Sequence, residues 1–374
     1  MGSFKVAANK LNLRTAPVED LRDKGNIIGK LLKDASFESV NQKVNKLGVW
    51  HQDANSHWAW EGGLETITAP LPPLPLKPEV AIGIKIENSL LTKLQIDQIW
   101  NTGETGDRAV VAILDSGIAL NCADLTNAVR PNETFRMRNF VTGSTTMDDD
   151  KGHGSHCAGI IASRNNLHAV GIAKGCKLYV GKIADSHNSP SVANMVKGLR
   201  WAGGLEIDSP DDIDIISMSN GSLLNIPDMK PTIDEILAKG KIIVCSIGNR
   251  SPQSLPSGGT FPAMFNGVIS VGAVDLDNNF QDFSYEFNNL TISCPGSGIF
   301  SYWINGVTHV ETGTSQSTAV CAGIVALLVS KLKKAGQINL QSKVLSLLLN
   351  SNFKVNSNGF KYRFIEPAKL LNSI

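Results

Sequence analysis

The chain has 374 residues, a length that suits one large α/β domain with a small second domain. Hydrophobic residues make up 42% of it, enough for a sizeable core, and the formal net charge of +1 points to neither a nucleic-acid partner nor a membrane-surface partner. No apolar run in the sequence reaches the length of a membrane span.

Residues 1–68 have the pattern of a small all-β domain. Their apolar runs are short and are separated by turn-forming residues. Half of the six tryptophans of the chain lie here, at Trp50, Trp58 and Trp60. Short segments of this kind are typical of a small antiparallel barrel, which we predict for this region.

Residues 69–80 are rich in proline. The stretch APLPPLPLKPEV holds five of the sixteen prolines of the chain. This density favours an extended polyproline II spacer, because proline cannot sit inside a helix or a sheet. We therefore predict a linker, with docking of the prolines on an aromatic groove as the alternative.

From residue 81 onward, apolar runs that suit strands alternate with helix-like stretches. The strand candidates are AVVAILDSG, KLYVGKI, IDIISMS, IIVCSIGN and GVISVGAV, and the helix candidates include SVANMVKGLRWAGG and TIDEILAKG. Such alternation predicts a parallel sheet covered by helices on both faces. Ligands of these sheets bind beyond the carboxyl ends of the strands, so the polar residues there are candidates for a site.

Three motif residues are each open to two interpretations. Asp115 ends a buried strand, where a carboxylate needs a partner, or it caps a helix. Asn249 follows another strand, either as a turn residue or as an amide donor to a reaction centre. Ser315 stands at the start of a long apolar helix, where free N–H groups could hold an oxyanion, or where a serine simply caps the helix.

Two histidines, His153 and His156, lie three positions apart in the stretch GHGSHCAG. On a helix they would share one face, which suits a metal site with two histidine ligands. The spacing suits equally well one catalytic histidine beside one buried histidine. A loop that leads into a core helix is the third interpretation, and the motif alone does not choose among them.

In chain order, the motifs LDSGI, GHGSHCAG, SIGN and GTSQSTAVCAG resemble those of the subtilisin-like serine protease family. The resemblance runs from about Leu94 to the C-terminus and includes ISMSNGS, FPAMFNGVISVGAV and GFKYRFIEPAKLLN. It implies a three-layer subtilisin-like α/β fold with a mostly parallel sheet for residues 81–374.

The N-terminal region carries a second resemblance. The segments LNLRTAP, IIGKL and HWAWEGGLE, within about Lys5 to Glu65, resemble the bacterial SH3-like domain. Members of that family often bind cell-wall peptides or protein partners. The resemblance therefore implies a protein or cell-wall partner for residues 1–68, without assigning the role to a single residue.

The protease resemblance implies a role for each motif residue. Ser315 corresponds to the nucleophile and His153 to the base that takes its proton. Asp115 would fix the imidazole tautomer and stabilise the imidazolium, and Asn249 would complete an oxyanion hole with the Ser315 N–H. His156 would be structural, and a metal site loses weight because no further ligand cluster accompanies the two histidines.

The resemblance also implies where substrate binds. Ser219, Asn220 and Gly221 correspond to the edge segment that pairs with the substrate backbone. Thr260 stands where many relatives have glycine at the base of the specificity pocket, and Arg250 follows Asn249 at its rim. We expect a preference for small, medium-sized or acidic residues before the scissile bond.

The nucleophile motif departs from the family pattern. Relatives usually have GTSMASPHVAG, whereas this chain has GTSQSTAVCAG, with Gln316 in place of methionine and Ala319 in place of proline. Loss of the proline restores a backbone donor near Ser315. The leading function is a serine endopeptidase; the alternatives are a peptide transpeptidase or macrocyclase, and a non-catalytic binding module.

The chemistry itself requires no cofactor. Asp124 resembles a calcium-ligand position of the family, so we expect that a structural calcium ion could bind there. A polypeptide or peptide substrate is the partner that the resemblance implies, with no nucleic acid and no membrane span.

The cysteines bear on the compartment. They are scattered in apolar, small-residue contexts that are typical of buried free thiols, which favours a reducing, cytoplasmic setting. The six are Cys122, Cys157, Cys176, Cys245, Cys294 and Cys321. No secretory leader is visible, but the opening Met-Gly-Ser resembles a cloning remnant, so secretion after removal of a leader is the alternative.

Overall fold

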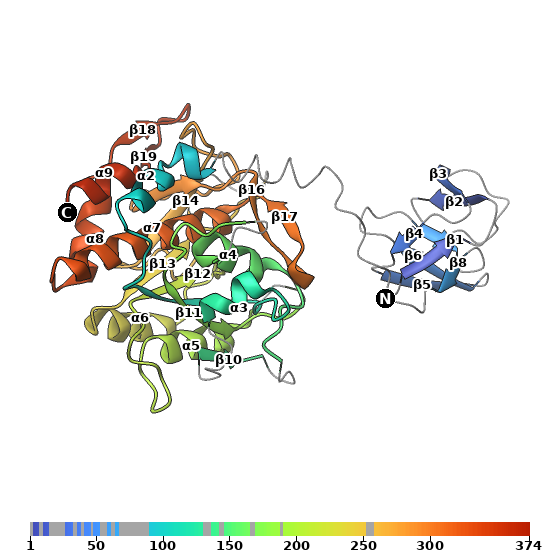
Figure 1. Cartoon of the computed structure of the whole chain (residues 1–374), viewed down its shortest axis with the longest axis horizontal. Coiled ribbons are helices and arrows are strands. Elements are labelled where there is room, and N and C mark those ends of the chain that lie inside the picture. Colours follow the sequence, from blue (N-terminus) through green and yellow to red (C-terminus); the bar gives the residue numbers. More distant parts are fainter. Residues whose placement is uncertain are drawn as a thin grey trace. The chain divides into compact units, whose positions relative to one another are not determined.

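A computed structural model describes the strands between residues 3 and 66, and residues 90–129, 136–141, 146–164, 169–187, 190–251 and 258–374. The chain divides into two compact units, Met1–Lys77 and Pro78–Ile374 (Figure 1). The predicted linker, residues 69–80, lies outside the described residues. Its role as a spacer, and the domain boundaries drawn from it, stay predictions.

The strands described in the first unit form two antiparallel sheets. One sheet has the order β4-β1-β8 and the other β3-β2-β7-β6-β5. The strands are β1 (Ser3–Val6), β2 (Lys10–Arg14), β3 (Ile27–Leu32), β4 (Ser36–Glu38), β5 (Asn41–Asn45), β6 (Gly48–Gln52), β7 (Trp58–Trp60) and β8 (Leu64–Thr66). The identification of this unit as an SH3-like barrel stays a prediction.

The second unit is built on a seven-stranded parallel sheet in the order β10-β11-β9-β12-β13-β14-β15. The strands are β9 (Val110–Asp115), β10 (Met137–Asn139), β11 (Lys177–Lys182), β12 (Ile215–Met218), β13 (Ile242–Ser246), β14 (Ile269–Val274) and β15 (Ile292–Pro295). Five of these are the apolar runs identified in the sequence, so the predicted parallel sheet is confirmed. The two edge strands, β10 and β15, were not anticipated.

Helices cover both faces of this sheet. Successive side chains of β9 point to opposite faces of the sheet and so belong to two different hydrophobic cores. The first core contains Val111 and Ile113, and the second contains Val110, Ala112 and Leu114. The first core also contains apolar residues of α2 (Ile96–Asn101), α3 (Ala123–Val129), α4 (His153–Ala162), α7 (Thr314–Lys334), α8 (Leu340–Leu349) and α9 (Pro367–Asn372). The second contains those of α5 (Val192–Ala202) and α6 (Met229–Ala238), which completes three layers.

The central helix of the first core is α7. This helix has 21 residues, and the most apolar 18-residue window of it has a mean hydropathy of 1.4. By length and composition alone, α7 could therefore cross a membrane. However, 89% of that window is buried inside the unit. The sequence showed no run of this length because the polar residues of its first turn, among them Ser315, interrupt the apolar pattern. We read α7 as a core helix.

Two hairpins extend the second unit. Strands β16 (Ile299–Tyr302) and β17 (Thr308–Glu311) pair antiparallel around a 3-10 turn, η3 (Ile304–Gly306), and β18 (Phe353–Val355) pairs with β19 (Lys361–Arg363). The first hairpin packs so closely against α4 that a side chain at Gly159 would collide with Ser301. The strand β17 ends four residues before Ser315, so this hairpin reaches the candidate site.

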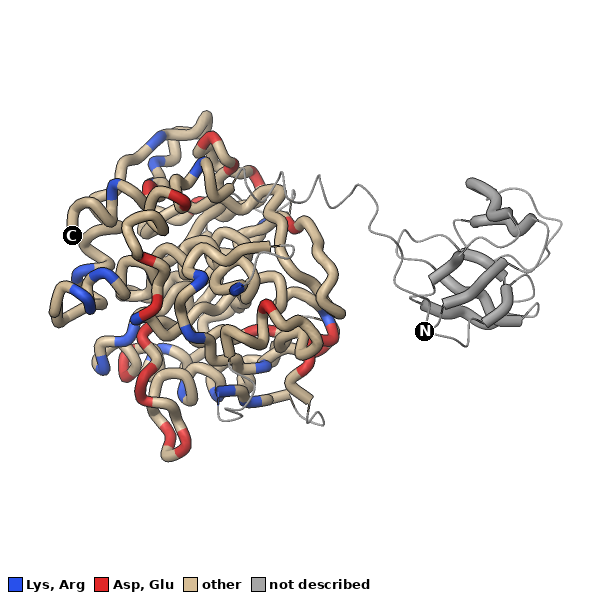
Figure 2. Tube along the Cα trace, in the orientation of Figure 1, with Lys and Arg blue, Asp and Glu red and all other residues tan. Residues whose placement is uncertain are grey.

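Charges are mixed over the second unit. Figure 2 shows Lys and Arg interleaved with Asp and Glu along the trace of this unit.

Candidate active site

The candidate residues gather at the carboxyl ends of the central strands. Asp115 is the last residue of β9, and Ser219 directly follows β12. Asn249 lies three residues after β13. In parallel sheets this edge is where ligands bind, as the sequence predicted.

Asp115 is completely buried and contacts His153 directly. Its Oδ1 lies 2.7 Å from His153 Nδ1 and accepts a hydrogen bond of 2.8 Å from the Ser116 N–H. With Nδ1–H donated to the carboxylate, the other imidazole nitrogen, Nε2, is free to accept a proton. His153, held in place by Asp115, can therefore act as a general base through Nε2.

His153 begins α4 and is 13% exposed at its side chain. Burial by itself lowers the pKa of His153, but the charges of Asp115, Asp149 and Glu311 and the hydrogen bond to Asp115 outweigh it, so that the pKa is raised. The preceding residue, Gly152, has φ of 101°, and a side chain there would collide with the ring of Trp303. The hairpin thus closes directly over the entry to the helix.

Ser315 is the second residue of α7. Its Oγ donates to the Ser219 carbonyl at 3.2 Å, and Ser219 Oγ donates to the Ser315 carbonyl at 3.2 Å. Ser219 Oγ also accepts a hydrogen bond of 3.7 Å from the thiol of Cys157, which lies on α4 one turn after His153. Ser219 therefore links the starts of α4 and α7, although no hydrogen bond joins His153 to Ser315 within the described part of the chain.

Asn249 is oriented by the first residue of α7. Its Oδ1 accepts two hydrogen bonds of 2.9 Å, from the N–H and from the hydroxyl of Thr314. This fixes the amide so that Nδ2 is the group left to donate. A side chain added at Gly313 would lie 3.0 Å from Nδ2, so the free donor faces the backbone just before Ser315.

Thr260 packs between two glycines of neighbouring segments. A methyl group added at Gly248 would lie 2.6 Å from Thr260 Cγ2, and one added at Gly221 would collide with Thr260 Oγ1. The hydroxyl donates to the Ser246 carbonyl at 3.0 Å. The side chain of Thr260 therefore occupies the space between the segment of Gly221 and that of Asn249.

Two donors on the segments around Thr260 have no hydrogen-bond partner in the described part of the chain. Asn220 Nδ2 and Arg250 Nε are buried and form no hydrogen bond with any residue that the structure describes. The backbone of Arg250 is held by its N–H, which donates to the Phe283 carbonyl at 2.8 Å. Both side chains thus keep hydrogen-bonding capacity in the region where the sequence places the substrate.

His156 is buried on the same helix as His153 but in a different environment. Its Nε2 lies 3.2 Å from the His309 carbonyl, and its ring meets that of Trp303 edge-on with centroids 6.0 Å apart. Burial lowers the pKa of His156 to about 3, so this imidazole is neutral. Its surroundings fit a packing role.

Among the residues that the structure describes, one group of side chains has atoms close enough to hold a metal ion. The ligand atoms of Asp115, His153 and Cys157 all lie within 4.8 Å of one another. Burial raises the pKa of the Cys157 thiol well above its usual value, so the thiol stays protonated, and a thiol is a poor ligand compared with a thiolate. The carboxylate and imidazole are already bonded to each other.

Asp124, the expected calcium ligand, lies on α3 and is buried. The Tyr302 hydroxyl donates to Oδ2, and Oδ1 has no hydrogen-bond partner among the residues described. Calcium takes six to eight oxygen ligands, whereas this carboxylate offers one free oxygen. Residues 165–168, in the loop expected to supply further ligands, lie outside the described residues, and the side chains placed around Asp124 do not make a calcium site by themselves.

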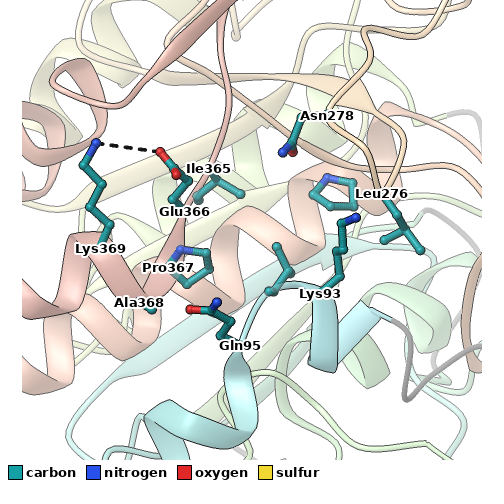
Figure 3. Close-up of a pocket in the computed structure, with 11 residues that line it drawn as sticks. Lys93, Gln95, Leu276, Asn278, Ile365, Glu366, Pro367, Ala368 and Lys369 are labelled. Atoms are coloured by element: carbon teal, nitrogen blue, oxygen red, sulfur yellow. Dashed lines mark ion pairs between the residues drawn. The ribbon is translucent and has the colours of Figure 1, made fainter.

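A separate hollow of about 210 Å³ lies between the turn before α2, the segment Leu276–Asn278 and the start of α9 (Figure 3). Its charged groups are already compensated: Lys93 contacts Asp277 at 2.8 Å, and Lys369 lies 3.8 Å from Glu366. None of the candidate residues lines it, so we do not connect it with the site.

Sequence reasoning missed Asp149, Lys182 and Cys157. Asp149 is in the run of three aspartates before His153, and a carboxylate so close to a candidate base is the signal that could have identified it. Lys182 ends β11 and is completely buried beside Asp115, a position that its apolar strand does not reveal. Cys157 counted only as one of the buried thiols, which all six cysteines prove to be.

Comparison with known proteins agrees with this geometry. Residues 106–364 match the subtilase family. Subtilisin DY of Bacillus licheniformis is 29% identical over 258 residues, which is 69% of this chain and 89% of that protein. Subtilisin E of Bacillus subtilis is 30% identical over 64% of this chain and 60% of its own length, and Subtilisin Savinase of Lederbergia lenta is 30% identical over 64% and 83%. The chain therefore belongs to the subtilase family and is a subtilisin-like serine peptidase.

Proposed function

We propose that the protein is an endopeptidase that hydrolyses peptide bonds through an acyl-enzyme on Ser315. The observation that carries the proposal is the 2.7 Å contact between Asp115 and His153 beside the start of α7. A buried carboxylate that holds an imidazole next to a serine at a helix start has the parts of an acyl-transfer site.

His153 would take the proton of Ser315 as the hydroxyl attacks the scissile carbonyl. A serine hydroxyl barely ionises at neutral pH, so the step needs this base. The Ser315 hydroxyl donates to the Ser219 carbonyl, and it would have to leave this bond in order to donate to the imidazole. Catalytic hydrogen bonds are often unformed without substrate. His153 would then give the proton to the leaving amine, and water would release the acyl group by the same route.

The oxyanion of the tetrahedral intermediate would be held by Asn249 Nδ2 and the Ser315 N–H. Support comes from the two hydrogen bonds that Thr314 donates to Asn249 Oδ1, which leave Nδ2 as the donor. The start of the 21-residue helix α7 adds free N–H groups and the positive end of its dipole. Donors fixed before the reaction stabilise the developing charge without reorganisation.

Substrate would lie in extended form along Ser219, Asn220 and Gly221. The neighbouring Ser222 exchanges two backbone hydrogen bonds with Phe261, of 2.9 and 2.7 Å, which hold this segment in place. Thr260 would form the floor of the pocket for the residue before the scissile bond. Its position between Gly221 and Gly248 supports a short pocket, and the unpartnered Arg250 Nε supports a preference for an acidic side chain.

The test is cleavage of a peptide library by the full chain, followed by mass spectrometry, with Ser315→Ala as the blank. We expect internal cleavage and labelling of Ser315 by a fluorophosphonate probe. Absence of labelling would refute the nucleophile assignment. Products joined to an added amine in place of hydrolysed ends would instead favour transpeptidation.

A further inference from the structure

A second buried carboxylate, that of Asp149, lies four residues before His153. It accepts hydrogen bonds from the Ser116 hydroxyl at 2.8 Å, the N–H groups of Lys151, Gly152 and Ser155 at 3.1, 2.8 and 2.8 Å, and the Ser155 hydroxyl at 2.6 Å. Burial raises the pKa of Asp149, but these donors outweigh it and lower the pKa, so the group is ionised. Two donors for each oxygen, and a third on one, need a carboxylate rather than an amide.

Ser116 joins this carboxylate to Asp115. Its N–H donates to Asp115 Oδ1 at 2.8 Å, and its hydroxyl donates to Asp149 Oδ1 at 2.8 Å. The same hydroxyl accepts from the Gly154 N–H at 2.9 Å. The amides on both sides of His153, those of Gly152 and Gly154, are therefore anchored to one network, directly or through Ser116.

Lys182 closes the network on the side of the sheet. Its ammonium group is completely buried and donates to the carbonyls of Ser116 and Asp148 at 2.8 and 2.7 Å and to Asp150 Oδ1 at 2.9 Å. All three ammonium hydrogens are used. Lys182 thus ties the turn after Asp115 to the segment before His153, and its charge is paired with that of Asp150.

We propose that Asp149 is a positioning residue for the catalytic base, acting on His153 through Ser116 and the first turn of α4, with Lys182 holding the two segments together. This inference rests on the proposed function of His153. The network fixes the imidazole against Asp115, and the charge of Asp149 favours the protonated imidazole that forms as Ser315 attacks.

Other charged or titratable groups also face the imidazole, so the effect of Asp149 must be separated from theirs. Asp115 faces it from β9 and Glu311 from β17, where Glu311 is paired with His309 at 3.2 Å. His156 and Cys157 lie on α4 itself. A substitution at Asp149 leaves all of these unchanged.

The test compares Asp149→Asn with Asp148→Asn in the full chain. The asparagine at 149 keeps one oxygen for the donors at Oδ1. Its amide group then faces the N–H and the hydroxyl of Ser155, and only the hydroxyl can turn to accept from it. Asp148 is the matched control: it is exposed, and among the residues described its side chain accepts only from the Leu120 N–H, at 3.0 Å. Three quantities are measured: the imidazole pKa of His153 by NMR, assigned with His153→Gln, the values of kcat and KM, and the midpoint of thermal unfolding.

For Asp149→Asn we expect a lower pKa of His153 and a fall in kcat of about 10- to 100-fold with KM unchanged, because a small misplacement of the base is costly. For Asp148→Asn we expect no change in the pKa of His153 and no fall in kcat. An unchanged His153 pKa and kcat in Asp149→Asn, with only a lower unfolding midpoint, would mean a merely structural role and would overturn the proposal.

Ser116→Ala covers the case in which Asp149→Asn does not fold. It keeps the Asp149 charge and removes the bridging hydroxyl, so kcat should fall at unchanged KM, and a normal kcat would overturn the proposal. The NMR measurement needs no turnover. If the native chain cleaves no peptide, the proposed function fails, while a shift of the His153 pKa in Asp149→Asn still decides whether Asp149 acts on this imidazole.

Discussion

The two sides of the candidate active site differ in how completely their polar groups are satisfied. On the side of the base, Asp149 and Lys182 use their bonding capacity within a buried network, although Asp115 Oδ2 has no hydrogen-bond partner among the residues described. On the side of the nucleophile, Ser315 Oγ has one hydrogen bond of 3.2 Å, and Asn220 Nδ2 and Arg250 Nε have none with the residues described. In the function proposed above, the base needs one tautomer and one position, whereas the other side would be completed by the substrate. Substitutions on the two sides should therefore fail in different ways.

The largest expected effect is the loss of the catalytic unit. Ser315→Ala, His153→Ala or Asp115→Asn should each lower kcat by about 10⁴-fold or more, since each removes a part without which the others cannot act. The measurement is steady-state turnover of one peptide by each variant.

The combination of these variants sharpens the first prediction. The triple variant should be little worse than Ser315→Ala, because the residues act as a unit. Effects that multiply across the three residues would show that they act independently and would contradict the assignment.

Asn249→Ala should have the next largest effect. It removes one prearranged donor to the oxyanion, so kcat should fall by about 10²- to 10³-fold with little change in KM. Thr314→Val is the matched control, because it removes the hydroxyl bonded to Asn249 Oδ1 and keeps the N–H bond. A loss as large in the control as in Asn249→Ala would shift the role from the donor to its orientation.

Thr260→Gly should widen the range of substrates. Relief of overpacking of about 1–3 kcal/mol should raise kcat/KM for a peptide with phenylalanine before the scissile bond, relative to one with alanine. Native enzyme that already cleaves the phenylalanine peptide as well as the alanine peptide would rule out the short pocket.

Arg250→Ala is the companion variant for the pocket. Because Arg250 is only partly buried, its charge should favour glutamate over leucine by about 1 kcal/mol, and only glutamate turnover should fall in the variant. Equal losses for both peptides would assign Arg250 to packing instead.

His156→Gln should change stability and leave turnover nearly unaffected, in contrast to His153. The pKa of His156 is about 3 in the folded chain and 6.5 for the free side chain. The unfolded chain therefore binds the extra proton between these values, and the stability gained from neutral His156 is present above pH 6.5 and is lost as the pH falls towards 3.

Urea unfolding at pH 7 and pH 4 measures this effect. The glutamine variant should be destabilised by about 1–2 kcal/mol at pH 7. At pH 4 this difference should close or reverse, because only the native chain loses the stability of the neutral imidazole. A difference that widens at low pH would mean that His156 is charged in the folded chain.

The smallest expected effect is that of a chelator. Since the residues described around Asp124 offer one free carboxylate oxygen, EDTA should leave the midpoint of thermal unfolding unchanged. A fall that added calcium reverses, and that is absent in Asp124→Asn, would place a cation at Asp124 and bear out the sequence-based expectation.

The sequence predicted the central strands because their apolar runs are long. The edge strands escaped notice for physical reasons: Met137–Asn139 is three half-buried residues, and Ile292–Pro295 is short and ends in proline. Both depend on pairing with neighbours far along the chain, which no local pattern records.

Within the site, residue types and chain order identified Asp115, His153, Ser315 and Asn249 as candidates. They could not show which member of the aspartate run is buried: Asp149 is, while Asp148 and Asp150 are exposed, because the path of the loop turns only one of the three inward. Nor could they show that Thr260 fills the gap between Gly221 and Gly248, which depends on the approach of three separate segments.

The buried cysteines of the second unit can serve as natural probes of local opening. Burial raises the pKa of Cys122, Cys157, Cys176, Cys245 and Cys294, so their thiols carry almost no thiolate in the closed structure. An alkylating reagent can therefore reach them only when the surrounding structure opens. Cys157 would report opening beside the base, and Cys245 opening of the sheet beneath Asn249. The rates at which the two thiols become alkylated would rank the local stability of these places without any probe being introduced.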